Sequence, residues 1–441
     1  MRARFAPVLL AVALAALVAA CGGAKDSLRV GVLADCDGIF GGFYDVALGG
    51  AELPLLRRGG KLAGALPANG IAGISVGGRP LELVFGCAGE QTSGAVELRR
   101  LVESEGAEIV VGPNVVPLGL VTTEYARHQP DVTFAVTSWE VLTHLDPGPN
   151  VFRFTLGYAQ GSAGLGAYAY HELGWRRAAT IATPDPLGWG FHAAPVAEFC
   201  ALGGKIVDRV WLDADPAQVP AQLSRIPTEG IDGFFVLTGG VEAGIFLERY
   251  AKTKPALSRS VVLNAYALTG LDPAVTARIG DGIVGTVAGW DVPGPFLPSF
   301  AAYMKEYRRA FPRLADAADA GFHLFDIYYH NAMEAVLQAL EAVDGDLSDG
   351  QRRFRAALAD VKLDAPNGSI RLDANRQAIG SVYRFQITGN DKGTLSIRLL
   401  KPIENVDASF GGRFGPGDPI PDRTRPPCDA GIPPAWAARG G

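Results

Sequence analysis

The chain has 441 residues, 48% of them hydrophobic and 20% charged, and it carries a formal net charge of −6 at pH 7. This length suffices for two or three average domains with a substantial core. The acidic balance and the lack of a lysine- or arginine-rich cluster argue against a nucleic-acid partner.

The N-terminal segment has the pattern of an export signal. Two arginines precede an apolar stretch at 5–18, which has the size of a signal-peptide core and is shorter than the roughly 20 residues that span a bilayer. It ends in VAAC, which resembles the bacterial lipobox; an ordinary secretory signal with a chance cysteine is the alternative. We expect a signal peptide at 1–20, lipidation of Cys21 and a flexible tether at 21–27. The folded body would then be lipid-anchored at the extracytoplasmic face of the membrane or in the periplasm.

From residue 28 onward, short apolar runs alternate with segments of helical periodicity. The predicted strands lie at 28–34, 81–85, 109–111, 133–136, 178–182, 205–211, 233–237 and 261–264. The predicted helices lie at 44–58 (broken by Pro54), from Thr92 onward, and at 117–127, 159–173, 190–202, 217–226 and 242–252. Near-continuous apolar strands separated by helices indicate parallel sheets covered on both faces, and two such series predict two α/β lobes. Ligands bind outside the carboxyl ends of such strands, so two lobes can close around a small molecule.

No catalytic or metal-binding motif accompanies these elements. The glycines at 38–42 do not form G-x-G-x-x-G, and neither a G-x-S-x-G elbow nor a P-loop is present. No CxxC, HExxH or clustered Cys/His spacing occurs, so a zinc site is not expected. The pattern predicts a binding protein rather than an enzyme, without a cofactor or a metal.

Segments along most of the chain resemble one family in their order and spacing. They include LRVGVLADCDGIFGGFYDVALGGAEL at 28–53, AEIVVGPN at 107–114, IDGFFVLTGG at 231–240 and AGFHLFDIYYHN at 320–331. In the same order, these are similar to four segments of that family. The first two are a first strand with its ligand loop and Gly-Ala-Glu helix, and an I-x-x-V-I-G-P strand and loop. The last two are a Gly-Gly loop and a returning helix with Asp326 at its usual aspartate. The family is the branched-chain amino-acid (Leu/Ile/Val-binding) class of periplasmic solute-binding proteins of ABC importers, and the resemblance spans about 28–400.

The resemblance implies an α/β protein of two three-layer lobes with mostly parallel sheets joined by a three-segment hinge, the type I periplasmic-binding fold. We expect lobe one at 28–154 and 288–364, and lobe two at 155–287 and 365–408. The segment at 409–441 is rich in proline and glycine, which predicts a tail that does not fold alone.

Four cysteines follow Cys21, namely Cys36, Cys87, Cys200 and Cys428. In an oxidising compartment they allow two disulfides in three connectivities. With the lobes assigned by the resemblance, Cys36 and Cys87 both follow strands of lobe one on the cleft side, which favours their pairing. Cys428 would then tie the tail to Cys200. A disulfide requires Cα atoms within about 7 Å, so the sequence leaves the connectivity open.

Loops at the family's ligand-contacting positions predict the site. The predicted ligand-binding residues are Phe40, Phe43, Tyr44, Asn114, Thr137, Ser138, Trp139, Trp189, Gly239 and Tyr266. Each aromatic residue among them has core or interlobe packing as its alternative role. Asp185 and Glu140 are predicted as solvated rim groups, because carboxylates are seldom buried without a cation.

Two departures from the family alter the expected ligand. Asn114 and its apolar neighbours stand where a serine-rich stretch holds a ligand carboxylate, and Tyr266 aligns with the acid that holds an ammonium group. An unpaired buried charge is costly, so an amino acid is less well supported than the fold. The expected solute is a branched-chain or hydrophobic amino acid, or a related aromatic or apolar carboxylate or amide.

The resemblance therefore implies a monomeric, extracytoplasmic receptor that captures a small organic solute and presents it to an ABC permease in the membrane. The alternative is a ligand-sensing lipoprotein that signals to a membrane receptor instead, since the same fold serves both purposes.

Overall fold

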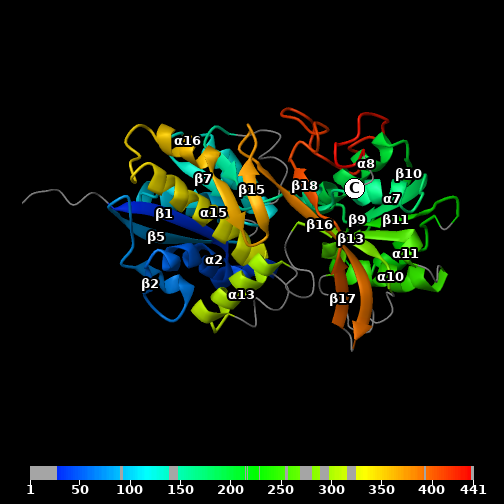
Figure 1. The fold of residues 1–441 in the computed structure, drawn as a ribbon, viewed down its shortest axis with the longest axis horizontal. Coiled ribbons are helices and arrows are strands. Elements are labelled where there is room, and N and C mark those ends of the chain that lie inside the picture. Colours follow the sequence, from blue (N-terminus) through cyan, green and yellow to red (C-terminus); the bar gives the residue numbers. More distant parts are fainter. Residues whose placement is uncertain are drawn as a thin grey trace, which may run out of the picture.

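Two α/β lobes lie side by side in the computed structural model, each with helices around a central sheet (Figure 1). The structure describes residues 27–89, 93–138, 148–213, 215, 217–227, 229–253, 257–268, 281–288, 297–314, 324–391 and 394–438. Both sheets are mixed, the first mostly parallel and the second with a parallel and an antiparallel half, and the predicted α/β fold class is confirmed. The predicted export signal, Cys21 and the start of the tether lie outside the described residues.

Lobe one is built on a sheet with the order β4-β5-β1-β6-β7-β8. Its strands are β1 (Leu28–Asp35), β4 (Ser75–Val76), β5 (Arg79–Ala88), β6 (Ile109–Val111), β7 (Thr133–Val136) and β8 (Val151–Arg153). All neighbours pair in parallel except β4 with β5. Val30, Val32 and Leu33 of β1 are completely buried, as expected for a central strand covered on both faces.

A pair of helices, α2 (Tyr44–Arg57) and α15 (Leu324–Ala342), packs together in lobe one. The prediction that Pro54 breaks the first of these helices is wrong, because α2 continues through it. Residues 46–55 are all buried, and their packing offsets the hydrogen bond that proline cannot donate. The other helices of this lobe include α3 (Gly94–Arg99), α4 (Val116–Ala126), α13 (Pro298–Ala310) and α16 (Arg352–Asp360).

Lobe two is built on the parallel half of the second sheet, which joins an antiparallel half. The parallel strands are β9 (Arg177–Ala182), β10 (Lys205–Trp211), β11 (Gly233–Val236), β12 (Val261–Asn264) and β13 (Val284–Val287). The antiparallel strands are β14 (Lys362–Ala365), β15 (Gly368–Leu372), β16 (Ala378–Asp391), β17 (Thr394–Leu399) and β18 (Ile403–Val406). β14 packs on α15, and β15 lies beside α15 and α16 in lobe one (Figure 1). The chain thus enters lobe two after β8, returns to lobe one through α13, α15 and α16, and enters lobe two again along β16.

The helix predicted at 159–173 is instead two short helices, α6 (Tyr158–Gly161) and α7 (Leu165–His171). Gly164 separates them in a left-handed conformation (φ +86°). Glu198 of α8 (Pro186–Ala201) accepts hydrogen bonds from the backbone N–H groups of Gly164, Gly166 and Ala167. This carboxylate therefore stabilises a helix start that local sequence does not reveal. The remaining helices of the lobe include α9 (Val219–Leu223), α10 (Gly240–Thr253) and α11 (Leu257–Ser260).

Two disulfides are present, Cys36–Cys87 in lobe one and Cys200–Cys428 between α8 and the C-terminal tail. Their Cα atoms are 5.4 Å and 5.1 Å apart, so the favoured pairing is confirmed. The tail packs on lobe two as well: the Trp436 indole donates to Glu198 (2.8 Å) and its ring contacts Phe410. No described helix has both the length and the apolar character needed to cross a membrane.

Candidate functional site

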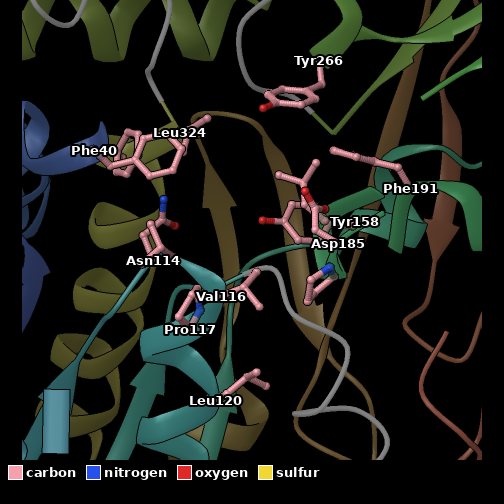
Figure 2. Close-up of a pocket in the computed structure, with 14 residues that line it drawn as sticks. Phe40, Asn114, Val116, Pro117, Leu120, Tyr158, Asp185, Phe191, Tyr266 and Leu324 are labelled. Atoms are coloured by element: carbon pink, nitrogen blue, oxygen red, sulfur yellow. The ribbon is translucent and has the colours of Figure 1, made fainter. Parts of the chain in front are cut away.

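A cavity of about 330 Å³ lies between the two lobes, and Figure 2 shows side chains of both lobes pointing into it. It is lined by Phe40, Asn114, Val115, Val116, Pro117, Leu120, Tyr158, Asp185, Pro186, Leu187, Phe191, Tyr266, Leu324 and Phe325. Several of these residues follow the carboxyl ends of β1, β6, β9 and β12, where open parallel sheets bind ligands. The volume is at the lower end of the usual range for small-molecule sites, about 300–1,000 Å³.

Lobe one contributes an apolar wall with one amide. Phe40 comes from the short helix η1 (Gly38–Phe43), and its ring contacts Phe325 at 5.4 Å between centroids. Asn114 follows β6 and is 5% exposed, and its amide oxygen has no hydrogen-bond partner within the described part of the chain. Figure 2 shows the Asn114 amide directed into the cavity. The wall therefore offers a ligand one polar group on an otherwise apolar surface.

The position of Asn114 depends on the turn before it. Gly112 has φ +96°, and a Cβ atom there would lie 2.2 Å from the carbonyl oxygen of Leu33 at the end of β1. Only glycine fits this close approach of two strand ends. The turn then leads into α4, whose first turn, Val116 and Pro117, lines the cavity directly after Asn114.

Lobe two contributes an aromatic wall. The Phe191 ring lies 4.8 Å from that of Tyr158 and 5.6 Å from that of Tyr266, the latter pair being nearly parallel at 22°. Gly239 makes room for this arrangement, because a Cβ atom there would lie 2.6 Å from the Tyr266 ring. The backbone N–H of Tyr266 donates to the Asn264 side chain at the end of β12 (2.9 Å), which fixes the start of the loop.

Asp185 is the one charged side chain among the described residues that line the cavity. It caps the N-terminus of α8, accepting hydrogen bonds from the Gly188 N–H (2.8 Å) and the Thr183 hydroxyl (3.1 Å). Burial raises the pKa of Tyr266, and the negative charges of Asp185 and Glu242 raise it further. The lobe-two wall is therefore both aromatic and electronegative.

Three of the predicted ligand-binding residues, Phe40, Asn114 and Tyr266, line the cavity together, and Gly239 lies behind Tyr266. Phe43 stacks on Phe325 with centroids 4.9 Å apart, and Tyr44 begins α2; neither is part of the lining.

The other predictions lie elsewhere or are not described. Thr137 and Ser138 follow β7 and are completely buried, and Trp189 is half-buried on α8; none of the three lines the cavity. Trp139 and Glu140 lie outside the described residues. A ligand-contacting role for any predicted residue stays a prediction.

The lining includes residues that sequence reasoning did not select, among them Tyr158, Phe191, Leu324 and Phe325. Tyr158 and Phe191 lie on different helices that only tertiary packing brings together. Asp185 was expected at a solvated rim, and the structure places it in the lining. Its position in the loop that follows the buried strand β9 is a signal that could have identified it.

A family model described as periplasmic binding protein matches residues 27–394. An ABC transporter substrate-binding protein from Sphaerobacter thermophilus is similar in structure, with a TM-score of 0.71 and 22% identity over 87% of this chain and 99% of that one. A solute-binding protein of an ABC transporter from R. palustris was solved in complex with benzoate. It has a TM-score of 0.63 and 20% identity over 86% of this chain and 98% of that one.

A leucine-binding protein from Thermotoga maritima has a TM-score of 0.63 and 17% identity over 86% of this chain and 99% of that one. These likenesses establish the type I periplasmic-binding fold that the sequence predicted. No curated protein is significantly similar in sequence.

Proposed function

The chain belongs to the periplasmic binding protein family, whose members bind solutes for ABC transporters and are not enzymes, and we propose that it binds a small, largely apolar carboxylate or amide. We infer that it is the lipid-anchored receptor of an importer for this solute. Benzoate and benzamide represent this class. The protein captures its solute without converting it.

The observation that supports this solute class is the lining of the interlobe cavity. Phe40 and Phe325 from lobe one face Tyr158, Phe191 and Tyr266 from lobe two. Burying an apolar body between them contributes about 25 cal/mol per Å² removed from water, and offset or edge-on ring contacts add to this. An aromatic or branched apolar body is therefore the part of the solute that this cavity accommodates best.

The polar end of the solute has a matching position on lobe one. The Asn114 amide can donate a hydrogen bond, and the first N–H groups of α4 begin two residues later. A helix N-terminus and a side-chain amide both attract a carboxylate or an amide oxygen of the solute, although neither protein group carries a full positive charge. The R. palustris neighbour, which was solved with benzoate, supports an aromatic acid as the first solute to test.

A hydrophobic amino acid is the second candidate, and Asp185 is the observation that favours it. The carboxylate of Asp185 lies in the lobe-two part of the lining, opposite Asn114 (Figure 2). It can pair with an ammonium group while Asn114 and α4 hold the carboxylate of the same solute. The leucine-binding neighbour from Thermotoga maritima supports testing leucine beside benzoate.

Calorimetric titration of the purified protein with benzoate, benzamide, L-leucine and L-phenylalanine tests the proposal. We expect saturable binding of benzoate or benzamide. Phe40→Ala should weaken that binding about tenfold through lost ring contact and burial, whereas Leu66→Ala, at a partly exposed loop position, should not. Failure of all four compounds to bind, together with binding of a strongly polar solute such as a sugar, would contradict the apolar class.

Asp185→Asn separates the two candidate solutes. Asparagine caps a helix as well as aspartate does, so α8 should stay intact while the negative charge is removed. Benzoate affinity should rise about threefold, because a like charge near the solute is lost, whereas L-leucine affinity should fall at least tenfold if its ammonium group pairs with Asp185. Asp208→Asn on β10, an exposed position outside the lining, is the matched control. Equal effects on both solutes would show that Asp185 acts only as a helix cap.

We also propose that Cys21 carries the lipid anchor. The VAAC sequence supports this, and two disulfides fit an oxidising compartment outside the cytoplasm. Expressed in a bacterial host, the protein should be in the membrane fraction, and mass spectrometry should find a diacylglyceryl group on Cys21. Cys21→Ser should release the protein from the membrane or leave it there with its signal peptide uncleaved. Its solute affinity should not change. Recovery of unmodified wild-type protein in the soluble periplasmic fraction would indicate an ordinary secretory signal instead.

A further inference from the structure

The Cys36–Cys87 disulfide lies beside the turn that carries Phe40. β1 and β5 are parallel neighbours whose last paired residues are Asp35 and Ala88, so both strands end together on the cavity side. Cys36 directly follows β1, and its N–H donates to the Ala88 carbonyl (3.2 Å). The helical turn η1 starts two residues after Cys36 and places Phe40 in the cavity lining. The disulfide therefore joins the base of this turn to the end of β5.

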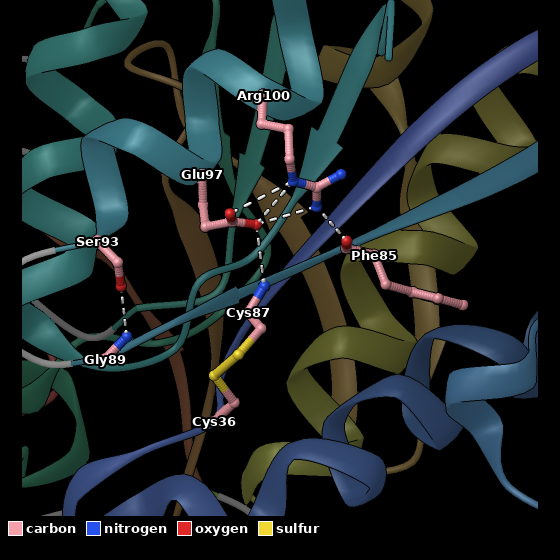
Figure 3. Close-up of a disulfide and its surroundings, with 7 residues drawn as sticks. All are labelled: Cys36, Phe85, Cys87, Gly89, Ser93, Glu97 and Arg100. Atoms are coloured by element: carbon pink, nitrogen blue, oxygen red, sulfur yellow. Dashed lines mark hydrogen bonds and ion pairs between the residues drawn. A yellow bond between two sulfur atoms is a disulfide. The ribbon is translucent and has the colours of Figure 1, made fainter. Parts of the chain in front are cut away.

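The β5 side of the disulfide is held by α3 and the residues around it. Figure 3 shows the Glu97 carboxylate accepting from the Cys87 N–H (3.3 Å) and pairing with Arg100 (2.9 Å). Arg100 also donates to the carbonyl oxygen of Phe85 (2.6 Å). Further along, the Gly89 N–H donates to the Ser93 hydroxyl (2.9 Å). The backbone at the end of β5 is thus fixed from both sides of Cys87.

The turn itself folds back onto Cys36. A Cβ atom at Gly41 would lie 2.8 Å from the carbonyl carbon and oxygen of Cys36, so the turn depends on glycine at that position. The Asp37 N-cap makes no side-chain capping bond to η1, and its carboxylate lies against Gly89 instead. The turn thus takes its position from Cys36 and from the β5 end rather than from its own cap.

We propose that the Cys36–Cys87 disulfide is a positioning element of the solute site, which holds the η1 turn so that Phe40 is already in place before the solute binds. This inference rests on the proposed function, since it concerns the same cavity. Prearranged side chains avoid the loss of rotamer freedom on binding, so the disulfide increases affinity without touching the solute. Cys36 is half-buried and Cys87 is exposed, so a reductant can reach the bond in the folded protein.

The test compares Cys36→Ser/Cys87→Ser with Cys200→Ser/Cys428→Ser, which removes the disulfide between α8 and the tail. In the first variant, affinity for benzoate or L-leucine, whichever the wild type binds, should fall about three- to tenfold through faster dissociation. The second variant should keep its affinity within twofold although it also loses stability. In a Phe40→Ala background, removal of Cys36 and Cys87 should no longer change the affinity, because the disulfide acts through that side chain.

Hydrogen–deuterium exchange of the ligand-free protein tests the positioning separately from solute binding. Amide exchange at 38–43 should become faster when Cys36 and Cys87 are replaced, and should not change when Cys200 and Cys428 are replaced. Unchanged exchange at 38–43 would overturn the inference even if solute binds. Equal losses of affinity in both disulfide variants would overturn it as well, because the effect would then follow overall stability. Wild-type protein that binds none of the solutes while exchange responds as expected would refute the proposed solute class and leave the positioning role supported.

Discussion

Several ionisable side chains are buried and have displaced pKa values. Burial raises the pKa of Glu52 to about 8, with a further contribution from Asp45, and raises that of Glu198 to about 7. Burial lowers the pKa of His192 to about 3 and that of His330 to about 4. Within the described part of the chain neither carboxyl oxygen of Glu52 has a hydrogen-bond partner, which agrees with a protonated, neutral group at neutral pH.

These shifts act on stability in opposite directions. A glutamate with a raised pKa holds its proton only in the folded state between pH 4.5 and the raised value, so stability falls as pH rises through that window. A histidine with a lowered pKa binds a proton only when unfolded between its lowered value and 6.5, so stability falls as pH decreases through that window. The two effects on stability oppose each other from pH 4.5 to 6.5. From about pH 7 to 8 the pH dependence of stability comes mainly from Glu52.

We therefore expect the stability of the wild type to decrease between pH 6.5 and 8, with a slope of up to about 1.4 kcal/mol per pH unit from Glu52. Glu52→Gln should flatten this slope, because glutamine has no proton to release. Glu82→Gln, at an exposed position on β5, should leave the slope unchanged. Thermal unfolding at several pH values measures this, and parallel curves for wild type and Glu52→Gln would contradict the assignment.

At the scale of elements, close backbone contact between α2 and α15 organises lobe one. A Cβ atom at Gly50 would lie 2.1 Å from the backbone oxygen of Asp326, and α15 also carries Leu324 and Phe325 in the cavity lining. The contact of these helices therefore sets the position of part of the solute site. The same packing keeps α2 helical through Pro54, against its local preference.

Gly50→Ala should consequently destabilise lobe one by about 3 kcal/mol or more, because a backbone atom rather than a flexible side chain must move. Gly42→Ala is the matched control, since a Cβ atom there meets nothing within 4 Å. Chemical denaturation followed by circular dichroism compares the two variants. A Gly50→Ala protein as stable as the control would mean that the two helices can separate at little cost.

At the scale of the whole molecule, each disulfide lies within one lobe. Cys36–Cys87 joins two strand ends of lobe one, and Cys200–Cys428 joins α8 of lobe two to the tail. The tail covers β10, an edge strand of the second sheet, with Cys428 near the Ile206 N–H and the Pro426 carbonyl accepting from Arg209. Such cover protects an exposed edge from pairing with other chains. Neither disulfide links the two lobes, so both leave the lobes free to move relative to each other around a solute.

Sequence alone determined the features that depend on short-range pattern and composition. Apolar runs placed β6, β7, β10 and β12 at their observed bounds, and the alternation of strands and helices predicted two parallel α/β lobes. The family resemblance favoured the observed pairing of the cysteines, but the sequence left the connectivity open until the structure brought β1 beside β5 and the tail beside α8. Phe40, Asn114 and Tyr266 were selected because the resemblance aligns them with the family's ligand-contacting loops, and all three line the cavity.

Only the tertiary structure decided which side chains share the cavity. Phe191 and Tyr158 lie inside helices, and their meeting with Tyr266 depends on how α6, α8 and the loop after β12 pack. The split at Gly164 depends on Glu198, which lies 34 residues further along the chain. The role of Asp185 in the lining depends on the approach of two lobes. These features arise from contacts between distant segments, whose energies a local sequence pattern does not contain.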